Sequence, residues 1–145
     1  MNKGFFAILL LGLIFTACQS PGPSYEIAGP QSQTIADMIE AVNEKNAEKY
    51  VKGFAEDVQV FVASEMKING REALQANRAN HFQNHPEVKS KIQHLVEIDE
   101  RVILHDKVWL DESDQNGQDI VEIFTFENGA VVRVDVIQPE NLFRR

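Results

Sequence analysis

The chain has 145 residues, of which 43% are hydrophobic and 25% charged, enough for one domain with a hydrophobic core and too few for two. With 14 Lys and Arg against 22 Asp and Glu, the formal net charge is -8, which argues against binding to nucleic acid or to anionic lipid surfaces. The single cysteine, Cys18, excludes an internal disulfide and a zinc site built from several thiolates.

Residues 1–17 have the organisation of a secretory signal peptide. Lys3 provides a positive charge, residues 5–15 contain no ionisable group, and the small residues Thr16 and Ala17 follow. A membrane-spanning helix needs about 20 apolar residues, so this stretch is too short to span and has the length of a signal-peptide hydrophobic region. We therefore expect cleavage near Ala17.

Cys18 ends the segment Phe15-Thr16-Ala17-Cys18, which resembles the lipobox of bacterial lipoproteins, with Phe15 in place of the usual aliphatic residue. The resemblance implies cleavage before Cys18, attachment of diacylglycerol to its sulfur and acylation of its amino group, for example with palmitate. Two or more acyl chains suffice for stable anchoring. Gln19 resembles a residue that directs lipoproteins to the outer membrane. The alternative is an unlipidated cysteine in an ordinary secreted protein.

The segment after Cys18 has the composition of a linker. Residues 19–32 contain three of the five prolines and two glycines, without apolar periodicity. Such a composition predicts a flexible tether. We therefore expect three regions: a signal peptide over 1–17, a lipidated cysteine and tether over 18–32, and one folded domain over 33–145.

The first part of the domain is predicted to contain two helices and a strand. Thr34 and Asp37 resemble a capping box, and apolar residues at helical spacing predict a helix that ends at about Asn46. A second, short helix is expected over residues 47–55. Valines that alternate with other residues over 58–62 then predict a strand.

The second part begins with a turn at Asn69-Gly70 and a helix over residues 71–84, which His85-Pro86 ends. Four further strands are predicted over 88–98, 102–110, 120–126 and 130–137, with turns at 115–117 and 128–129. The order ααβαββββ predicts an α+β fold in which the three helices, all in the N-terminal part of the domain, cover one side of a curved antiparallel sheet.

Four segments, spaced over residues 33–138, carry a family resemblance. They are AVNEKN (41–46), FAEDVQV (54–60), NGREAL (69–74) and FTFENGAVVRV (124–134). In this order they resemble the SnoaL-like and ketosteroid-isomerase-like proteins of the nuclear transport factor 2-like superfamily. The resemblance implies a cone, in which a strongly bent sheet and three helices enclose a pocket, and commonly a homodimer across the outer face of the sheet.

Ketosteroid isomerases remove a proton with a strand Asp and hold the oxyanion with a helix Tyr and a neutral strand Asp. The resemblance implies that Met38 occupies the position of the helix Tyr and that Val62 occupies the position of the base. Neither side chain can perform that chemistry. The remaining acid position is Glu122. The resemblance therefore implies a similar cavity, and steroid isomerisation is not expected.

Glu122 lies between Ile120 and Phe124 on one face of a predicted strand, where a carboxyl group is either desolvated or paired with a cation. We expect it to be an acid–base residue, with His94 as its partner because His94 shares a predicted face with Ile92. The other interpretations are that Glu122 faces solvent or a dimer interface, and that His94 is a packed core or rim residue.

Two further pairs of titratable residues lie close together in the sequence. His81 and His85 are four residues apart on a predicted helix, a spacing that suits a metal, but no third ligand is evident, so we expect neither metal nor cofactor. His105 and Asp106 are adjacent in a strand, so their side chains face opposite ways and cannot form a dyad.

These observations predict a lipid-anchored envelope protein that binds a small, mostly apolar molecule. Besides Glu122 and His94, the expected pocket residues are Tyr50, Phe54, Phe61, Phe82 and Phe124. One alternative is an enzyme of the isomerase, dehydratase or hydrolase type that uses the acid–base pair. The other is a structural or protein-binding lipoprotein whose interior is filled by its own side chains. The expected partners are the lipid bilayer through Cys18, the small ligand and a second copy of the chain.

Overall fold

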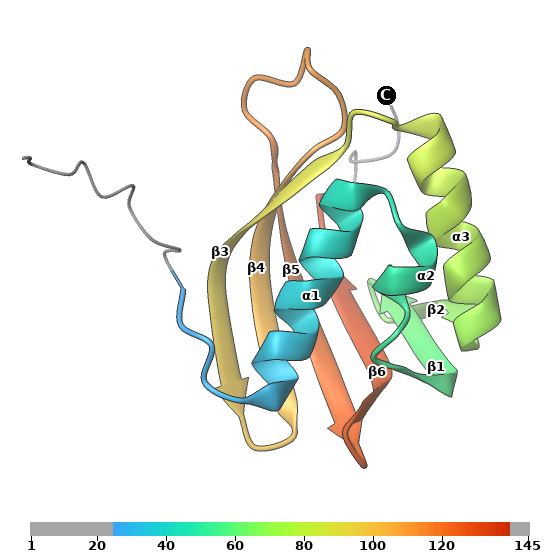
Figure 1. The fold of residues 1–145 in the computed structure, drawn as a ribbon, viewed down its shortest axis with the longest axis vertical. Helices are drawn as coiled ribbons and strands as arrows, with labels where there is room; N and C mark the ends of the chain where they lie inside the picture. Colours follow the sequence, from blue (N-terminus) through green and yellow to red (C-terminus); the bar gives the residue numbers. More distant parts are fainter. Residues whose placement is uncertain (1–24, 140–145) are drawn as a thin grey trace, which may run out of the picture.

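The computed structural model describes residues 25–139 (Figure 1). Over these residues the chain forms α1 (Pro30–Glu44), α2 (Ala47–Tyr50), β1 (Phe54–Val62), β2 (Glu65–Asn69), α3 (Arg71–Asn84), β3 (Lys89–Ile98), β4 (Arg101–Trp109), β5 (Gln118–Glu127) and β6 (Ala130–Ile137). The predicted signal peptide, Cys18 and the first part of the predicted tether lie outside the described residues. Within 25–139, no helix has the length and apolar character needed to cross a membrane.

All six strands of the described chain form one sheet in the order β2-β1-β6-β5-β4-β3. Neighbouring strands are antiparallel except β1 and β6, which are parallel. The predicted α+β class is confirmed, and the prediction of a purely antiparallel sheet is wrong at this pair. No hairpin joins β1 to β6, because most of the domain lies between them in sequence, and a long crossover permits parallel pairing.

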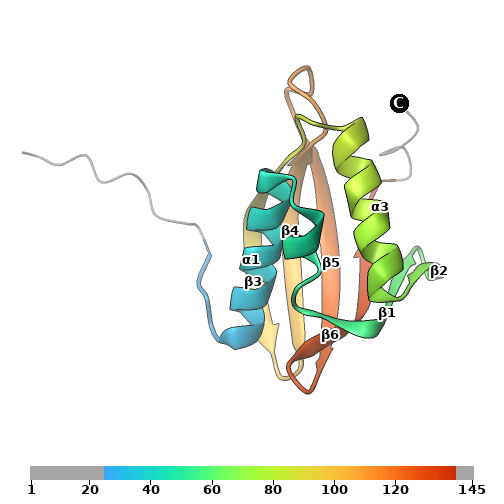
Figure 2. The ribbon, with the colours of Figure 1, turned by 45° about the vertical axis from the view of Figure 1, so that its right-hand side comes forward.

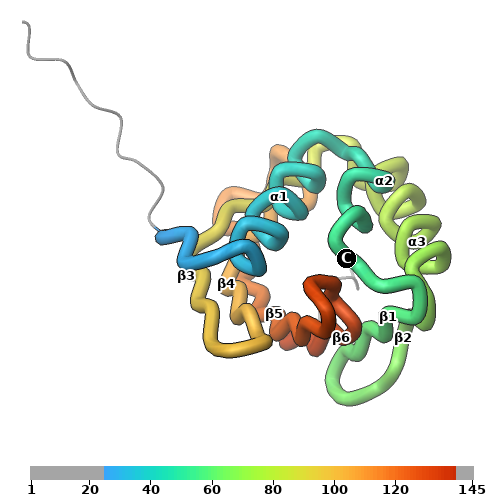
Figure 3. The backbone as a smooth tube through the Cα atoms, turned by 60° about the horizontal axis from the view of Figure 1, so that its bottom comes forward, coloured from blue at the N-terminus to red at the C-terminus, as the bar shows by residue number. Residues whose placement is uncertain are grey.

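The sheet is curved, and the helices cover its concave side (Figures 2 and 3). Irregularities in strand pairing between Val60 and Phe61, between Ile92 and His94, and between Thr125 and Phe126 accompany this curvature, as bulges increase the local bend of a strand. Helix α1 packs on β3 and β4, α3 packs on β1 and β2, and α2 contacts both other helices.

Helix α1 begins at Pro30, earlier than the predicted capping box at Thr34 and Asp37. Proline suits the first helical position because its fixed φ angle is already helical. The Gly29 N–H donates to Ser32 Oγ at 2.9 Å, and the Ser32 N–H donates to Glu97 Oε2 at 2.8 Å. These bonds fix the helix start against β3, so residues 30–32, predicted as part of the tether, belong to the first turn.

The predicted helix over 47–55 is wrong in its second half, because α2 ends at Tyr50 and β1 begins at Phe54. Phe54 pairs with Val131 of β6, and the Val131 N–H donates to the Gly53 carbonyl at 2.9 Å. The local apolar spacing is compatible with a helix, but pairing with a distant strand determines the structure here.

Strand β2 was not predicted. It forms a hairpin with β1 through Ala63 and Ser64, whose φ angles of 50° and 68° are left-handed. Its residues are mostly exposed, Met66 at 51%, because β2 is an edge strand with little buried surface. The sequence therefore lacks the apolar alternation by which strands are identified.

The later elements agree well with the sequence pattern. Helix α3 covers Arg71–Asn84 as predicted, after Gly70 with a φ of 96°, and β6 covers Ala130–Ile137 as predicted. Asn128 and Gly129, with φ angles of 51° and 81°, form the predicted turn between β5 and β6. Turns of this kind require positive φ angles, which Asn and Gly adopt most readily.

The hydrophobic core lies between the sheet and the helices. Its largest fully buried apolar side chains come from α1, β1, β4, β5, β6 and the segment before β3, and are Ile35, Val58, Val88, Val102, Leu104, Phe124, Phe126 and Val131. Full burial of an apolar side chain of this size contributes about 1.5–3 kcal/mol to the free energy of unfolding. The core does not fill the space between sheet and helices, which leaves room for the site described next.

Candidate functional site

A cavity of about 350 Å³ lies between the concave side of the sheet and the helices, and it is partly open to solvent. All the helices and strands named above contribute to its wall, which is mostly apolar. Lys67 of β2 and Asn77 of α3 are exposed lining residues and so mark the open end. Polar groups deeper in the wall come from Tyr50, Arg78, His81, Ser90, Asp106 and Glu122.

Three of the predicted aromatic residues, Tyr50, Phe54 and Phe82, line this cavity. Phe124 lies behind the wall in the core, edge-on to Phe54 with ring centroids 6.4 Å apart. Phe61 is on the outer face of the sheet, where the Arg133 guanidinium lies 3.8 Å from its ring centroid. The prediction that Phe61 and Phe124 line the pocket is therefore wrong.

The three positions identified through the ketosteroid-isomerase resemblance meet at the cavity. Met38 of α1, Val62 of β1 and Glu122 of β5 all line it. Glu122 is the only ionisable group among these three. The structure therefore has the cavity that the resemblance implies, without the tyrosine and the base of those isomerases.

Glu122 projects into the cavity from β5, where it pairs in register with Leu104 on one side and Val136 on the other. The pKa of Glu122 is raised to about 8, mainly by burial among apolar side chains and then by the charge of Asp106, while the charge of Arg78 opposes both effects. The carboxyl group is therefore largely protonated near neutral pH and can donate a hydrogen bond.

Asp106 is the second carboxyl group in the cavity wall, and its side chain is 3% exposed. Ser90 Oγ donates to Asp106 Oδ2 at 2.5 Å, whereas Asp106 Oδ1 has no hydrogen-bond partner among residues 25–139. Burial raises the pKa of Asp106 to about 6, and the bond from Ser90 opposes this shift. Asp106 is thus mostly ionised near neutral pH.

The side-chain amide of Asn43 of α1 binds both backbone polar groups of Ser90 and holds Ser90 in place. The Ser90 N–H donates to Asn43 Oδ1 at 2.8 Å, and Asn43 Nδ2 donates to the Ser90 carbonyl at 2.9 Å. Sequence reasoning missed this arrangement. Its one signal is the alternation Val102, Leu104, Asp106, in which a single charged residue follows apolar residues on the face that the structure shows to be buried.

Arg78 of α3 supplies positive charge to the cavity wall, and its guanidinium lies 5.7 Å from the Tyr50 ring centroid. Burial raises the pKa of Tyr50, so its hydroxyl keeps its proton. Burial also lowers the pKa of His81 to about 4, with smaller contributions from the charges of Arg78 and His85. Tyr50 and His81 are therefore neutral near pH 7, and the charges in the inner wall are those of Arg78 and Asp106.

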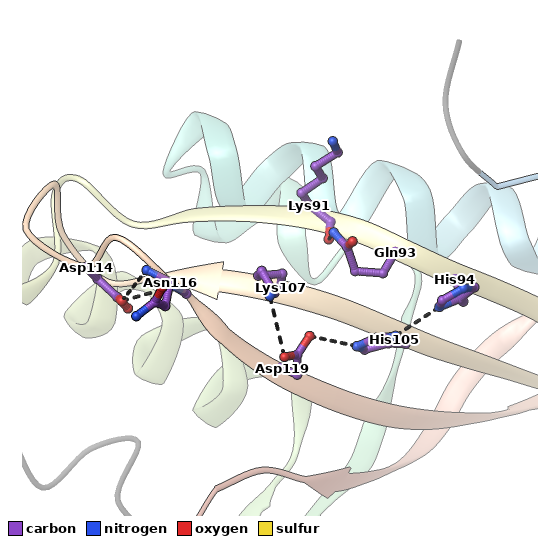
Figure 4. A network of polar contacts seen from close by, with 9 residues as sticks. Lys91, Gln93, His94, His105, Lys107, Asp114, Asn116 and Asp119 are labelled. Atoms are coloured by element: carbon purple, nitrogen blue, oxygen red, sulfur yellow. Dashed lines mark hydrogen bonds and ion pairs between the residues drawn. The ribbon is translucent and has the colours of Figure 1, made fainter. Parts of the chain in front are cut away.

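His94 is on the outer face of the sheet, so the predicted Glu122–His94 pair is wrong (Figure 4). The irregularity between Ile92 and His94 reverses the alternation of β3: Ile92 and Leu95 are buried, and His94 is exposed. His94 Nδ1 lies 3.0 Å from His105 Nδ1, and His105 Nε2 lies 2.9 Å from Asp119 Oδ1. Together with Lys107, whose Nζ lies 3.6 Å from Asp119 Oδ2, these residues form an outer polar network.

His105 and Asp106 face opposite sides of the sheet, as predicted: His105 joins the outer network and Asp106 lines the cavity. His81 and His85 lie close together, with ring centroids 4.8 Å apart. Over the described part of the chain, no three His, Cys, Asp or Glu residues are arranged to hold a metal ion.

The model of the SnoaL-like domain family matches residues 35–134, more than half of the chain. This range includes every helix and strand that contributes the polar cavity residues. No curated protein sequence matches the chain at a significant level.

Many solved structures share the fold. One is a SnoaL-like protein of unknown function from Burkholderia thailandensis, with a TM-score of 0.67, 15% identity, and coverage of 78% of this chain and 97% of that chain. A proposed ketosteroid isomerase from Kribbella flavida has a TM-score of 0.63 and 19% identity, covering 77% and 78%. AclR, a proposed hydroxylase from Streptomyces galilaeus, has a TM-score of 0.64 and 14% identity, covering 75% and 88%. At these identities the likeness concerns the fold alone.

The raised pKa of Glu122 predicts a pH-dependent effect of the substitution Glu122→Gln. The folded value of about 8 lies above the ordinary value of 4.5, so the folded state retains a proton that the unfolded state releases. The wild type therefore loses stability as pH rises from about 4.5 to about 8, and the variant lacks this loss. The unfolding free energy of the variant minus that of the wild type should therefore increase by more than about 1 kcal/mol when the pH rises from about 5 to about 8.

Urea denaturation at several pH values measures this difference. Glu127→Gln, at the exposed end of the same strand, is the matched control and should give a difference that does not vary in this way. A pH-independent difference for Glu122→Gln would show that the Glu122 carboxyl is ionised in the folded protein.

Proposed function

Since the chain belongs to the SnoaL-like domain family, we propose that its cavity binds a small, mostly apolar molecule and that the protein is a ligand-binding module of the cell envelope. The observation that carries the proposal is the cavity itself. Its volume of about 350 Å³ lies in the range of about 300–1,000 Å³ typical of small-molecule sites. Its mostly apolar wall with a few polar groups is also typical of such sites.

The polar groups of the wall would orient the ligand. Protonated Glu122 offers a hydrogen-bond donor, and ionised Asp106 offers an acceptor. Asn77 of α3 lies at the open end, where it would contact a polar part of the ligand that faces solvent. The alternative of a structural protein with a filled interior is disfavoured, because it requires side chains to occupy the space that the cavity takes.

A second candidate function is catalysis of the isomerase, dehydratase or hydrolase type. The observation that favours it is the pair of carboxyl groups in one cavity, with pKa values of about 6 for Asp106 and about 8 for Glu122. Such a separation gives one base and one acid at neutral pH. In this interpretation Asp106 replaces His94 as the partner of Glu122. A binding protein releases its ligand unchanged, whereas an enzyme converts it.

The binding proposal predicts that a bulky side chain in the cavity wall abolishes ligand retention. Val136 lines the cavity beside Glu122, on the neighbouring strand β6, so Val136→Phe would fill space without removing a polar group. Native mass spectrometry of the protein purified from its own host should show a bound small molecule in the wild type and none in this variant. Val121→Phe, on the opposite face of β5, is the control and should retain the ligand.

Thermal denaturation establishes that both variants are folded. Retention of the same molecule by folded Val136→Phe would place the ligand elsewhere and refute the cavity as its site. A wild-type protein that carries no small molecule and is not stabilised by any compound of a small apolar library would refute the function.

We also propose that Cys18 is the lipid anchor, on the basis of the lipobox resemblance and the preceding signal-peptide pattern. Mass spectrometry of the protein expressed in a bacterium should give a mature chain that starts at Cys18 with a diacylglyceryl group on sulfur. Cys18→Ser should remove the lipid and release the protein from membranes, since protein without acyl chains lacks this anchor. A mature protein with an unmodified cysteine thiol would contradict anchoring at this residue.

Self-association across the outer face of the sheet is a further part of the proposal. Exposed apolar side chains on this face include Val96 at 46%, Ile98 at 55% and Ile137 at 62%, and such exposure favours contact with another protein surface. Sedimentation of the domain should show a dimer, and Ile123→Lys, in the middle of the same face, should give a monomer. Ile27→Lys, before α1, is the control and should remain dimeric. A monomeric wild type would contradict the dimer.

A further inference from the structure

The cavity contains one acceptor atom whose pairing is incomplete. Asp106 is 3% exposed, it lines the cavity, and its Oδ1 has no hydrogen-bond partner within residues 25–139. Buried polar atoms in folded proteins are nearly always paired, because an unpaired one has lost its hydration without compensation. A ligand in the cavity is in position to provide the missing donor.

The orientation of Asp106 is fixed before any ligand enters. Its other oxygen, Oδ2, accepts from Ser90 Oγ, and Asn43 binds the Ser90 backbone through two hydrogen bonds. These contacts join α1, β3 and β4. Rotation of the Asp106 carboxylate would break its hydrogen bond to Ser90 Oγ. An acceptor held in this way contributes to ligand selectivity, since little order is lost when the ligand binds.

Glu122 is close enough to act on the same ligand group. Asp106 pairs in register with Ile120, two residues before Glu122, so the two carboxyl-bearing residues are diagonal neighbours on the cavity face of adjacent strands. Diagonal neighbours have Cα atoms about 7–8 Å apart, close enough for both side chains to reach one small polar group of a ligand. Near neutral pH one carboxyl group is an acceptor and the other can donate.

We propose that the ligand is a small apolar alcohol whose hydroxyl group donates a hydrogen bond to Asp106 Oδ1 and accepts one from Glu122. This inference rests on the proposed binding function and adds the chemical class of the ligand. A hydroxyl group is both donor and acceptor, so it satisfies both carboxyl groups. An ether can only accept, and an ammonium group can only donate, so each satisfies one of the two.

Three probes of matched shape distinguish these possibilities: adamantan-1-ol, 1-methoxyadamantane and 1-aminoadamantane. Calorimetric titration of the wild-type domain should show that the alcohol binds about tenfold more tightly than the ether or better, the range expected for one hydrogen bond to a charged group. Equal affinity for the alcohol and the ether would overturn the inference while leaving the cavity as an apolar binding site. If none of the three binds, the alcohol assignment fails, and the native mass spectrometry and compound library described above decide whether the proposed binding function fails with it.

The affinity for 1-aminoadamantane shows whether the two carboxyl groups select a neutral hydroxyl donor or a positive charge. Tighter binding of 1-aminoadamantane than of adamantan-1-ol would overturn the alcohol assignment, because the carboxyl pair would then select a positive charge. The order expected here is alcohol first, with the amine and the ether weaker.

Two variants test whether Asp106 is the acceptor. Asp106→Leu should bind the ether as well as the wild type does and should lose the tenfold preference for the alcohol. Ser90→Ala leaves the Asp106 carboxylate in the cavity but frees its orientation, so it should reduce the preference while keeping ether binding. If Asp106→Leu keeps the full preference, Asp106 is not the acceptor. The wild-type comparison stands by itself should Asp106→Leu fail to fold.

Discussion

Two carboxyl groups in a mostly apolar cavity wall, Asp106 buried and Glu122 partly buried, are the feature on which the arrangement of the site depends. A charged carboxylate loses its hydration in such surroundings, and protonation, hydrogen bonds or a nearby cation can offset that loss. All three occur here: Glu122 keeps its proton to about pH 8, Ser90 donates to Asp106, and the charge of Arg78 lowers the pKa of Glu122. Because these groups come from α3, β3, β4 and β5, the relative positions of four elements are linked through the two acids.

The two faces of the sheet divide the titratable residues into separate groups. His105 and Asp106 are neighbours in sequence, yet one belongs to the outer network and the other to the cavity. A single irregularity in β3 transfers His94 to the outer face as well. Strand register therefore decides which chemistry each surface carries, and a shift of one residue exchanges the two.

The sequence predicts those parts of the fold that local patterns determine. Helix α3 and strand β6 agree with their predicted ranges because each has a clear period and a glycine at the adjoining turn. The parallel β1–β6 pair, the early end of α2 and the edge strand β2 depend on contacts between distant segments or on little buried surface, so their own residues do not indicate them. Local patterns also do not identify the site, since Glu122 is recognised as a site residue through the family resemblance.

The Asn43–Ser90–Asp106 contacts join residues 47 and 16 positions apart, and no local pattern reports them. What the sequence does contain is an acid on the buried face of an apolar strand. In the alternation of β4, Asp106 stands where an aliphatic residue would stabilise the core more. A buried charge that the fold retains in such a place is a reason to look for a ligand.

The incomplete pairing of Asp106 also bears on the choice between binding and catalysis. A ligand that fully pairs Asp106 Oδ1 in its ground state stabilises the complex, but the same bond contributes to catalysis only as far as it strengthens in the transition state. A stable hydroxyl donor has a pKa far above that of Asp106, so its proton remains on the ligand and the bond is a binding interaction. Proton removal by a base with a pKa of about 6 requires a ligand whose acidity is raised by a neighbouring group. An unactivated apolar alcohol lacks such a group, so tight binding of this class favours the binding function over the enzymatic one.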